Sequence, residues 1–139
     1  MKNVYQARLS EMARAAEDIE SFCEGEGLPA AAAFAFSLCL DEVFTNICEY
    51  GYPGGGRGSI EIEMLREGGR VRAFIRDDGR PFNPLEECPE PDLDAPLEER
   101  KIGGLGIYFL KKNMDALAYR REGGRNELMM EKGIPQDDA

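Results

Sequence analysis

The sequence predicts an α+β fold in which helices cover one face of a mostly antiparallel mixed sheet, as a two-layer sandwich. Two observations indicate β-hairpins: alternating strand patterns flank a glycine pair at 68–69 and another at 123–124. A third indicates the helical layer, because apolar residues recur at helical spacing over about 11–24 and 29–50. No internal repeat is evident, which favours one continuous domain.

The composition fits a single domain at 1–133 followed by a flexible tail at 134–139. A net charge of −10 argues against nucleic acid as a partner, because phosphate binding needs clustered Lys and Arg. No signal segment or bilayer-spanning run is recognised, so we expect a cytoplasmic protein with no membrane partner. The four cysteines form no C-x-x-C pair and are expected to be reduced.

The absence of histidine excludes Ser-His-Asp and Cys-His nucleophile systems and imidazole metal ligands. A general base on this chain must therefore be a carboxylate or an amine.

The first half of the chain predicts one strand and two helices. A strand at 2–8 is followed by Ser10, a plausible N-cap for a helix at 11–24. Pro29 opens a second helix that ends near Tyr50. Its apolar, core-facing stripe consists of Phe36, Leu40, Val43 and Ile47.

The second half predicts two hairpins separated by a loop and a helix. In order, these are strands at 59–65 and 70–76, a loop at 83–102, a helix at 105–113, and strands at 116–121 and 127–132. The loop contains four prolines and many acidic residues, and a long loop in a compact domain is usually a lid or a disordered segment. A short helical turn within it is compatible with the sequence.

Glu42 and Asn46 lie four residues apart in the second predicted helix, so they share one face. Mg²⁺ prefers oxygen ligands, and the Asn46 amide oxygen could serve together with substrate phosphates. Glu42 could orient or deprotonate an attacking hydroxyl. Alternatively, both are ordinary polar residues on a solvated helix face.

Asp77 and Gly79 directly follow the strand at 70–76. A carboxylate at a strand end can accept a hydrogen bond from the exocyclic amine of adenine, while glycine permits close approach of the base. The same residues are also typical of a turn, so this segment alone leaves both interpretations open.

Gly103, Gly104 and Gly106 stand where the helix at 105–113 begins. Missing side chains expose amide groups and the positive helix end to phosphate oxygens. A loop that needs positive φ angles is the alternative. The segment is neither a P-loop, because no G-K-[ST] follows, nor a dinucleotide fingerprint, because no parallel βαβ unit surrounds it.

In combination, the three segments resemble the ATP-binding module shared by histidine kinases, DNA gyrase B and MutL, the GHKL or Bergerat fold. Glu42 to Asn46 match its N box, Asp77 to Phe82 its first glycine box, and Gly103 to Gly106 its second. More closely, these segments are similar to the stand-alone anti-sigma factor serine/threonine kinases, over roughly residues 5–132.

The resemblance implies ATP and Mg²⁺ as cofactors and a role for each motif. Glu42 would be the catalytic base and Asn46 the magnesium ligand. The nucleotide-binding set would be Asn46, Asp77, Gly79, Phe82, Gly103, Gly104, Leu105 and Gly106, with Asp77 on adenine and the glycines on the phosphates. The loop at 84–102 would be a lid, with Arg100 or Lys101 as its cation.

The resemblance also implies partners: a sigma factor, a STAS-type anti-sigma factor antagonist and a second copy of the chain. Two positions depart from the family pattern. Tyr50 stands where a histidine before glycine is frequent, and Met129 where the last strand often carries a threonine that helps to hold adenine.

Three functions remain open from the sequence. The first is a kinase that phosphorylates the antagonist and, in another complex, sequesters the sigma factor. The second is a non-catalytic interaction switch of the same fold, which Met129 mildly favours. The third is an ATPase without a protein acceptor.

Overall fold

The computed structural model describes residues 1–52, 58–87 and 104–135. Its elements follow the predicted order along the chain. They are β1 (Lys2–Gln6), the 3-10 turn η1 (Leu9–Glu11), α1 (Met12–Gly25), α2 (Ala30–Tyr50), β2 (Ser59–Glu67), β3 (Arg70–Asp77), α3 (Pro84–Glu87), α4 (Gly104–Asn113), β4 (Ala116–Glu122) and β5 (Arg125–Gly133). The short α3 is the helical turn that the loop sequence allowed.

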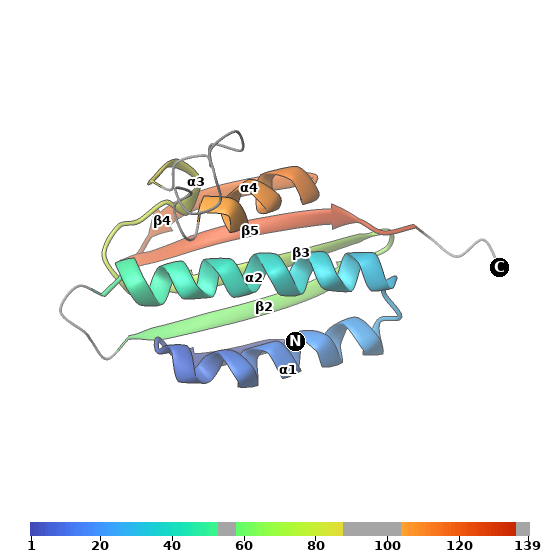
Figure 1. Cartoon of the computed structure of the whole chain (residues 1–139), viewed down its shortest axis with the longest axis horizontal. Coiled ribbons are helices and arrows are strands. Elements are labelled where there is room, and N and C mark those ends of the chain that lie inside the picture. The colour runs from blue at the N-terminus through green and yellow to red at the C-terminus, as the bar shows by residue number, and fades with distance from the viewer. Residues whose placement is uncertain (53–57, 88–103, 136–139) are drawn as a thin grey trace, which may run out of the picture.

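The five strands form one sheet in the order β1-β2-β3-β5-β4 (Figure 1). All four neighbouring pairs are antiparallel. The expected α+β class and mainly antiparallel pairing are confirmed, but the expected mixed character is not found among the described strands. The reason is the position of β5: it lies between β3 and β4, which run in the same direction and would pair in parallel if they were neighbours.

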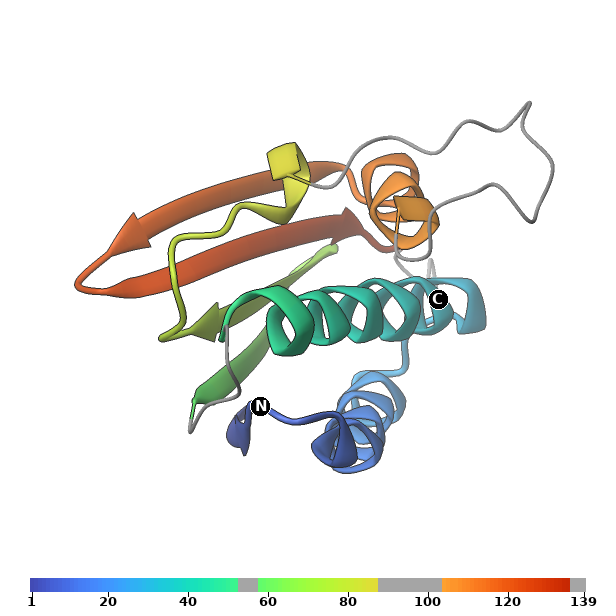
Figure 2. The ribbon, with the colours of Figure 1, turned by 60° about the vertical axis from the view of Figure 1, so that its left-hand side comes forward.

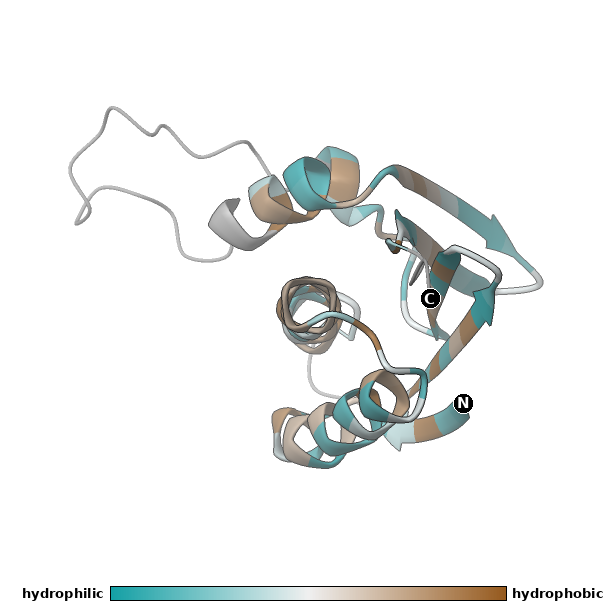
Figure 3. Cartoon of the chain, turned by 90° about the vertical axis from the view of Figure 1, so that its right-hand side faces the viewer, coloured by the Kyte–Doolittle hydropathy of each residue, from teal (hydrophilic) through white to brown (hydrophobic). Residues whose placement is uncertain are grey.

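The helices cover one face of this sheet (Figures 2 and 3). Side chains alternate along the strands, and the inward-facing set packs under α2. The predicted stripe of α2 is confirmed, since all four of its residues are at most 4% exposed. The largest fully buried side chains include Tyr5, Phe36, Phe44, Leu40, Ile60, Ile62, Met64, Ile75, Ile107, Leu110 and Met130.

The two predicted hairpins are confirmed by tight turns between their strands. Gly123 and Gly124 have φ angles of 60° and 76°, the left-handed values that a two-residue type I′ turn needs at both positions. This turn sets the register of β4 against β5.

The predicted N-cap at Ser10 is wrong. The chain first forms η1, and α1 begins at Met12 without a side-chain cap. The Glu11 carboxylate instead accepts hydrogen bonds from the Gln6 N–H at 3.1 Å and from Arg14. The end of β1 and the start of α1 are therefore joined through Glu11.

The expectation that no segment could cross a bilayer needs correction for α2. By length and composition alone α2 is apolar enough to span a membrane, although half of its most apolar stretch is buried inside the protein. A helix that is apolar on most sides is typical of a core position, and α2 lies between α1, α4 and the sheet.

Candidate functional site

Glu42 and Asn46 lie on α2 with unsatisfied polar atoms. Asn46 is 2% exposed and Glu42 is partly buried. Among the described residues, Glu42 Oε1 and Asn46 Nδ2 are the two buried side-chain atoms without a hydrogen-bond partner. Leaving such an atom unpaired costs about 1–3 kcal/mol, and most buried polar groups are paired. This pair is therefore suited to receive a ligand.

The environment of Glu42 makes its carboxyl group more basic. Burial raises its pKa, the nearby Asn46 amide lowers it in part, and the charges of Asp41 and Glu49 raise it further. The Asn46 contact still leaves Oε1 and Nδ2 without a hydrogen bond. A carboxylate with one buried oxygen that accepts no hydrogen bond is chemically suited to accept a proton.

Asp77 is buried at the end of β3, facing the helices. Its Oδ1 accepts hydrogen bonds from the Gly79 N–H at 2.9 Å and from Asn126 Nδ2 at 3.1 Å. Burial raises the Asp77 pKa, and these two bonds partly offset the effect. Because both bonds use Oδ1, Oδ2 is left for a further donor within the described part of the chain.

Asn126 on β5 is a residue of the candidate site that the sequence motifs did not indicate. Directly opposite Asp77 in the sheet, it donates to Asp77 and to the Arg80 carbonyl at 2.8 Å. Its Oδ1 accepts from the Phe82 N–H at 3.3 Å, from the Tyr119 hydroxyl and from Arg121. One buried amide thus holds both the Asp77 carboxylate and the loop that follows it.

A signal for Asn126 does exist in the sequence. Asn126, Leu128 and Met130 alternate along β5, and all three are buried. An asparagine in phase with core residues is unusual, because a buried polar side chain needs partners.

The loop after β3 packs against the end of α2 through two glycines. A Cβ on Gly79 would lie 2.5 Å from the Gly51 carbonyl oxygen, and one on Gly51 would lie 2.7 Å from the Ile47 oxygen. The Arg80 N–H donates a hydrogen bond to the Gly51 carbonyl oxygen at 2.9 Å. Gly79 is thus required by close backbone approach, and this contact joins the Asp77 segment to the helix that carries Glu42 and Asn46.

Phe82 and Tyr50 form a stacked pair with ring centroids 5.7 Å apart. Phe82 is buried, whereas Tyr50 is exposed. Phe82, Asp77, Asn126 and Tyr119, with neighbouring core residues, line a cavity of about 10 Å³. That volume corresponds to about one water molecule, so the space beside Asp77 is narrow.

Met129 does not lie at the Asp77 site. It is out of phase with Asn126 and Leu128 and faces the opposite side of the sheet, paired with Phe74 and Ala118. The expectation that Met129 replaces an adenine-contacting residue is therefore wrong, because strand alternation places Asn126 beside Asp77 instead.

The second glycine segment is described in part. Gly104, Leu105 and Gly106 form the first turn of α4, while Gly103 and the expected lid residues Arg100 and Lys101 lie outside the described residues. In Figure 1, α4 runs opposite to α2, so its first turn is directed toward the end of α2 that carries Glu42 and Asn46. Ile107 and Leu110 anchor α4 in the core.

No group of three or more Cys, Asp or Glu side chains that could hold a metal is found within the described ranges. A cation here would thus rely on few protein ligands. The Asn46 amide fits that requirement, because Mg²⁺ commonly takes one or two protein oxygens and completes its shell with phosphates and water.

Comparison with known proteins identifies a family match over most of the chain. The family model described as histidine kinase-like ATPase domain matches residues 5–132. The serine/threonine-protein kinase BtrW of Bordetella bronchiseptica is 29% identical over 97 residues, which cover 70% of this chain and 68% of that protein. The serine-protein kinase RsbW of Halalkalibacterium halodurans is 25% identical over 105 residues, covering 73% and 63%.

A third relative, the anti-sigma F factor of Bacillus thuringiensis, is 30% identical over 76 residues, which cover 55% of this chain and 51% of that protein. The chain thus matches about half to two thirds of these relatives' lengths. Among solved structures, the blue-light activated histidine kinase of Erythrobacter litoralis has a TM-score of 0.58 at 20% identity, covering 79% of this chain and 33% of that one. That similarity supports the fold.

Proposed function

The chain belongs to the histidine kinase-like ATPase domain family, and on that premise we propose that it is an ATP-binding anti-sigma regulatory factor with serine/threonine kinase activity. The observation that carries the proposal is the pair of unsatisfied atoms on α2, Glu42 Oε1 and Asn46 Nδ2. A purely structural surface would expose or pair such groups.

Glu42 is the proposed catalytic base. The acceptor hydroxyl oxygen bonds to the γ-phosphorus of ATP, the bond from that phosphorus to the bridging oxygen breaks, and ADP leaves. The hydroxyl proton passes to the Glu42 carboxylate. The raised pKa of Glu42 suits this role, since a stronger base accepts the proton more readily.

Asp77 is the proposed partner of the adenine amine, through the oxygen that Gly79 and Asn126 leave open. Asn46 is the proposed Mg²⁺ ligand, and Gly103 to Gly106 are proposed to lie along the phosphates. A bound Mg²⁺ would neutralise phosphate charge, which matters on a chain with a net charge of −10.

We further propose a cytoplasmic homodimer whose protein partners are a sigma factor and the antagonist that it phosphorylates. The name of the relative anti-sigma F factor supports a sigma factor as a partner, and the name serine-protein kinase RsbW supports a protein substrate. Sedimentation that shows only monomer at high concentration would contradict the homodimer.

A phosphate-transfer assay tests the catalytic role. Candidate antagonist proteins are incubated with radiolabelled ATP, Mg²⁺ and either the native chain or Glu42→Gln. Glu42→Gln should reduce transfer by about 100-fold or more and leave binding of the antagonist unchanged. Transfer that Glu42→Gln does not alter would remove Glu42 from the base role.

A non-catalytic protein-interaction switch is the second candidate function. The small cavity beside Asp77 favours it, because the space of about 10 Å³ between the described residues there holds about one water molecule. Calorimetric titration with ATP and ADP, each with and without Mg²⁺, separates the two. Magnesium-dependent binding supports the kinase, whereas the absence of binding favours a nucleotide-free switch.

A further inference from the structure

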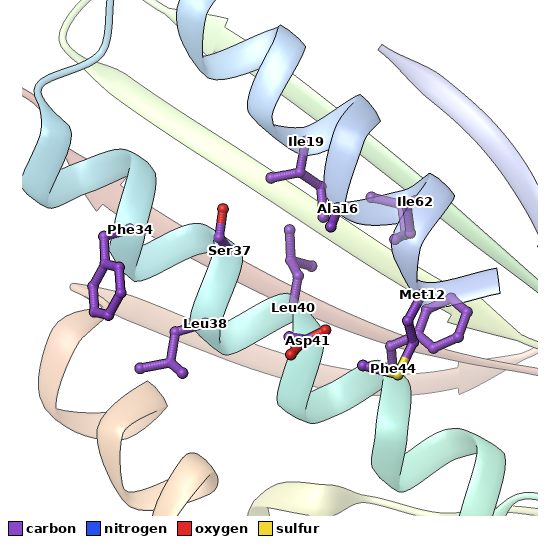
Figure 4. Close-up of a pocket in the computed structure, with 11 residues that line it drawn as sticks. Met12, Ala16, Ile19, Phe34, Ser37, Leu38, Leu40, Asp41, Phe44 and Ile62 are labelled. Atoms are coloured by element: carbon purple, nitrogen blue, oxygen red, sulfur yellow. The ribbon is translucent and has the colours of Figure 1, made fainter. Parts of the chain in front are cut away.

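An apolar groove lies between α1 and α2, away from the candidate nucleotide site (Figure 4). Its volume is about 260 Å³. Met12, Ala16 and Ile19 line it from α1, and Phe34, Leu38 and Leu40 are among the residues that line it from α2. Figure 4 shows Ile19 and Ala16 directed from α1 toward α2.

The α2 side of this groove carries apolar side chains in solvent. Phe34 is 69% exposed and Leu38 36% exposed, four residues apart on the same helix. A phenylalanine side chain left in water lacks the favourable free energy that its burial would contribute. Exposed apolar residues gathered beside a groove are typical of a protein-binding site.

The two helices that form the groove carry more carboxylates than cations. In α1 four carboxylates accompany one arginine, Arg14, which is bonded to Glu11. Three carboxylates and no cation occur in α2. Asp41 lines the groove itself (Figure 4) and has no ion pair within the described residues.

We propose that this groove binds an amphipathic helix of a partner protein, with an apolar face flanked by Lys and Arg. Helices dock in such grooves through apolar residues at positions i, i+3, i+4 and i+7. Cations beside the apolar face would meet Asp41 and the acidic exposed face of α1.

A second copy of this chain fits the groove less well. An isologous contact would place the acidic α1–α2 surface of one copy against the same surface of the other. Neither helix offers an unpaired cation to offset that repulsion, since the one arginine of the two helices is bonded to Glu11. Charge complementarity therefore selects a basic partner. Neither Glu42 nor Asn46 lines the groove, so the docking proposal concerns other side chains than the candidate nucleotide site does.

Fluorescence anisotropy with a labelled model helix tests the proposal. The probe is a peptide of about 18 residues, with Leu on one face and Lys on the other. One control peptide carries Glu in place of Lys, and a second has the Leu and Lys order scrambled. The Leu/Lys helix should bind the native chain, and both controls should bind at least about tenfold more weakly.

Three protein variants locate the contact. Phe34→Ser should weaken binding about tenfold, and Asp41→Asn about two- to threefold with a smaller salt dependence. Val4→Ser is the matched control, because Val4 is 56% exposed on the outer strand β1, and it should bind as the native chain does. All three positions are exposed, so each variant should fold. Circular dichroism verifies this.

Several results would overturn the proposal. These are no binding up to about 1 mM peptide, equal binding of the Glu peptide, or unchanged binding by Phe34→Ser. A native dimer that Phe34→Ser dissociates in sedimentation would assign the groove to a second copy instead.

Discussion

Arg76 and Asp77 are consecutive residues on β3, yet they belong to opposite faces of the sheet and to opposite kinds of electrostatic environment. On the open face, Arg76 donates to Glu127 at 2.7 Å, to Glu61 at 2.8 Å and to Glu63 at 2.9 Å. On the helix-covered face, Asp77 has two neutral donors, and Glu42 on α2 has an oxygen with none.

The carboxyl pKa values differ in direction between the two faces. Burial alone would raise the pKa of Glu61 and Glu127, but Arg76 and other arginines hold both below the ordinary range. Burial raises the pKa of Glu42 and Asp77, and no cation reverses it. Charges on the open face are thus paired within the chain and stabilise it, whereas those on the covered face remain available to a ligand.

Arg76→Met should break this contrast most strongly. It leaves three partly buried carboxylates close together, so we expect a loss of about 2 kcal/mol in the free energy of unfolding at pH 7. Urea denaturation measures it. Arg125→Met is the matched control. Arg125 is more exposed and, among the described residues, bonds Glu61 alone, so its loss should be below about 0.5 kcal/mol.

The Arg76 effect should depend on pH. Carboxyl groups with lowered pKa contribute stability above their ordinary pKa, near 4.3 for glutamate, and lose it as pH falls through the folded-state value. The difference between Arg76→Met and the native chain should therefore shrink below about pH 4. A difference that stays constant with pH would mean that Arg76 acts through packing.

Asp77→Asn should sharpen the contrast at the covered face. We expect nucleotide affinity to fall about tenfold or more, because a charged hydrogen bond is worth about 1.5–3 kcal/mol. Stability should not fall, since an amide oxygen can still accept from Gly79 and Asn126. Calorimetry measures affinity, and Asp78→Asn, next along the chain but bonded to Tyr52, should leave it unchanged.

Glu42→Gln should stabilise the fold slightly at neutral pH. A carboxyl group with a raised folded-state pKa favours the folded state at low pH, and this contribution is lost as pH rises through that pKa. The variant should therefore melt a few degrees higher than the native chain at pH 7, with the gap closing below about pH 4. Thermal melts across pH measure this, and a variant less stable at pH 7 would contradict the burial of an unpaired charge.

Met129→Thr should have the smallest effect. Because Met129 faces away from Asp77, nucleotide affinity measured by calorimetry should stay within about twofold of the native value. Leu128→Thr, one residue away but in the core, should lower stability by about 2 kcal/mol. Tighter nucleotide binding by Met129→Thr would contradict this and place residue 129 next to adenine.

Local periodicity explains what could be predicted. The four-residue spacing of Glu42 and Asn46 fixes their shared helical face wherever the helix lies. Glycine pairs between alternating segments predicted both hairpins, because the turn conformation is a property of the residues in it. The α+β class follows from the order of these elements.

The features that could not be predicted from the sequence depend on strand register. Alternation shows that residues 126, 128 and 130 share one face, but only the pairing of β5 with β3 places Asn126 opposite Asp77, 49 residues earlier. For the same reason, only the structure shows that Met129 faces away from Asp77. Ser10 is not a cap because it lies inside η1, whereas an N-cap residue has a non-helical backbone.

The sequence by itself determined the elements of this protein, the face shared by Glu42 and Asn46, and the family resemblance, because these depend on neighbours along the chain. Only the tertiary structure decided that Asn126 holds Asp77, that β5 separates β3 from β4, and that Phe34 remains exposed beside a groove. Those outcomes depend on burial and on contacts between distant segments, where the cost of an unpaired polar atom is set by the surrounding protein.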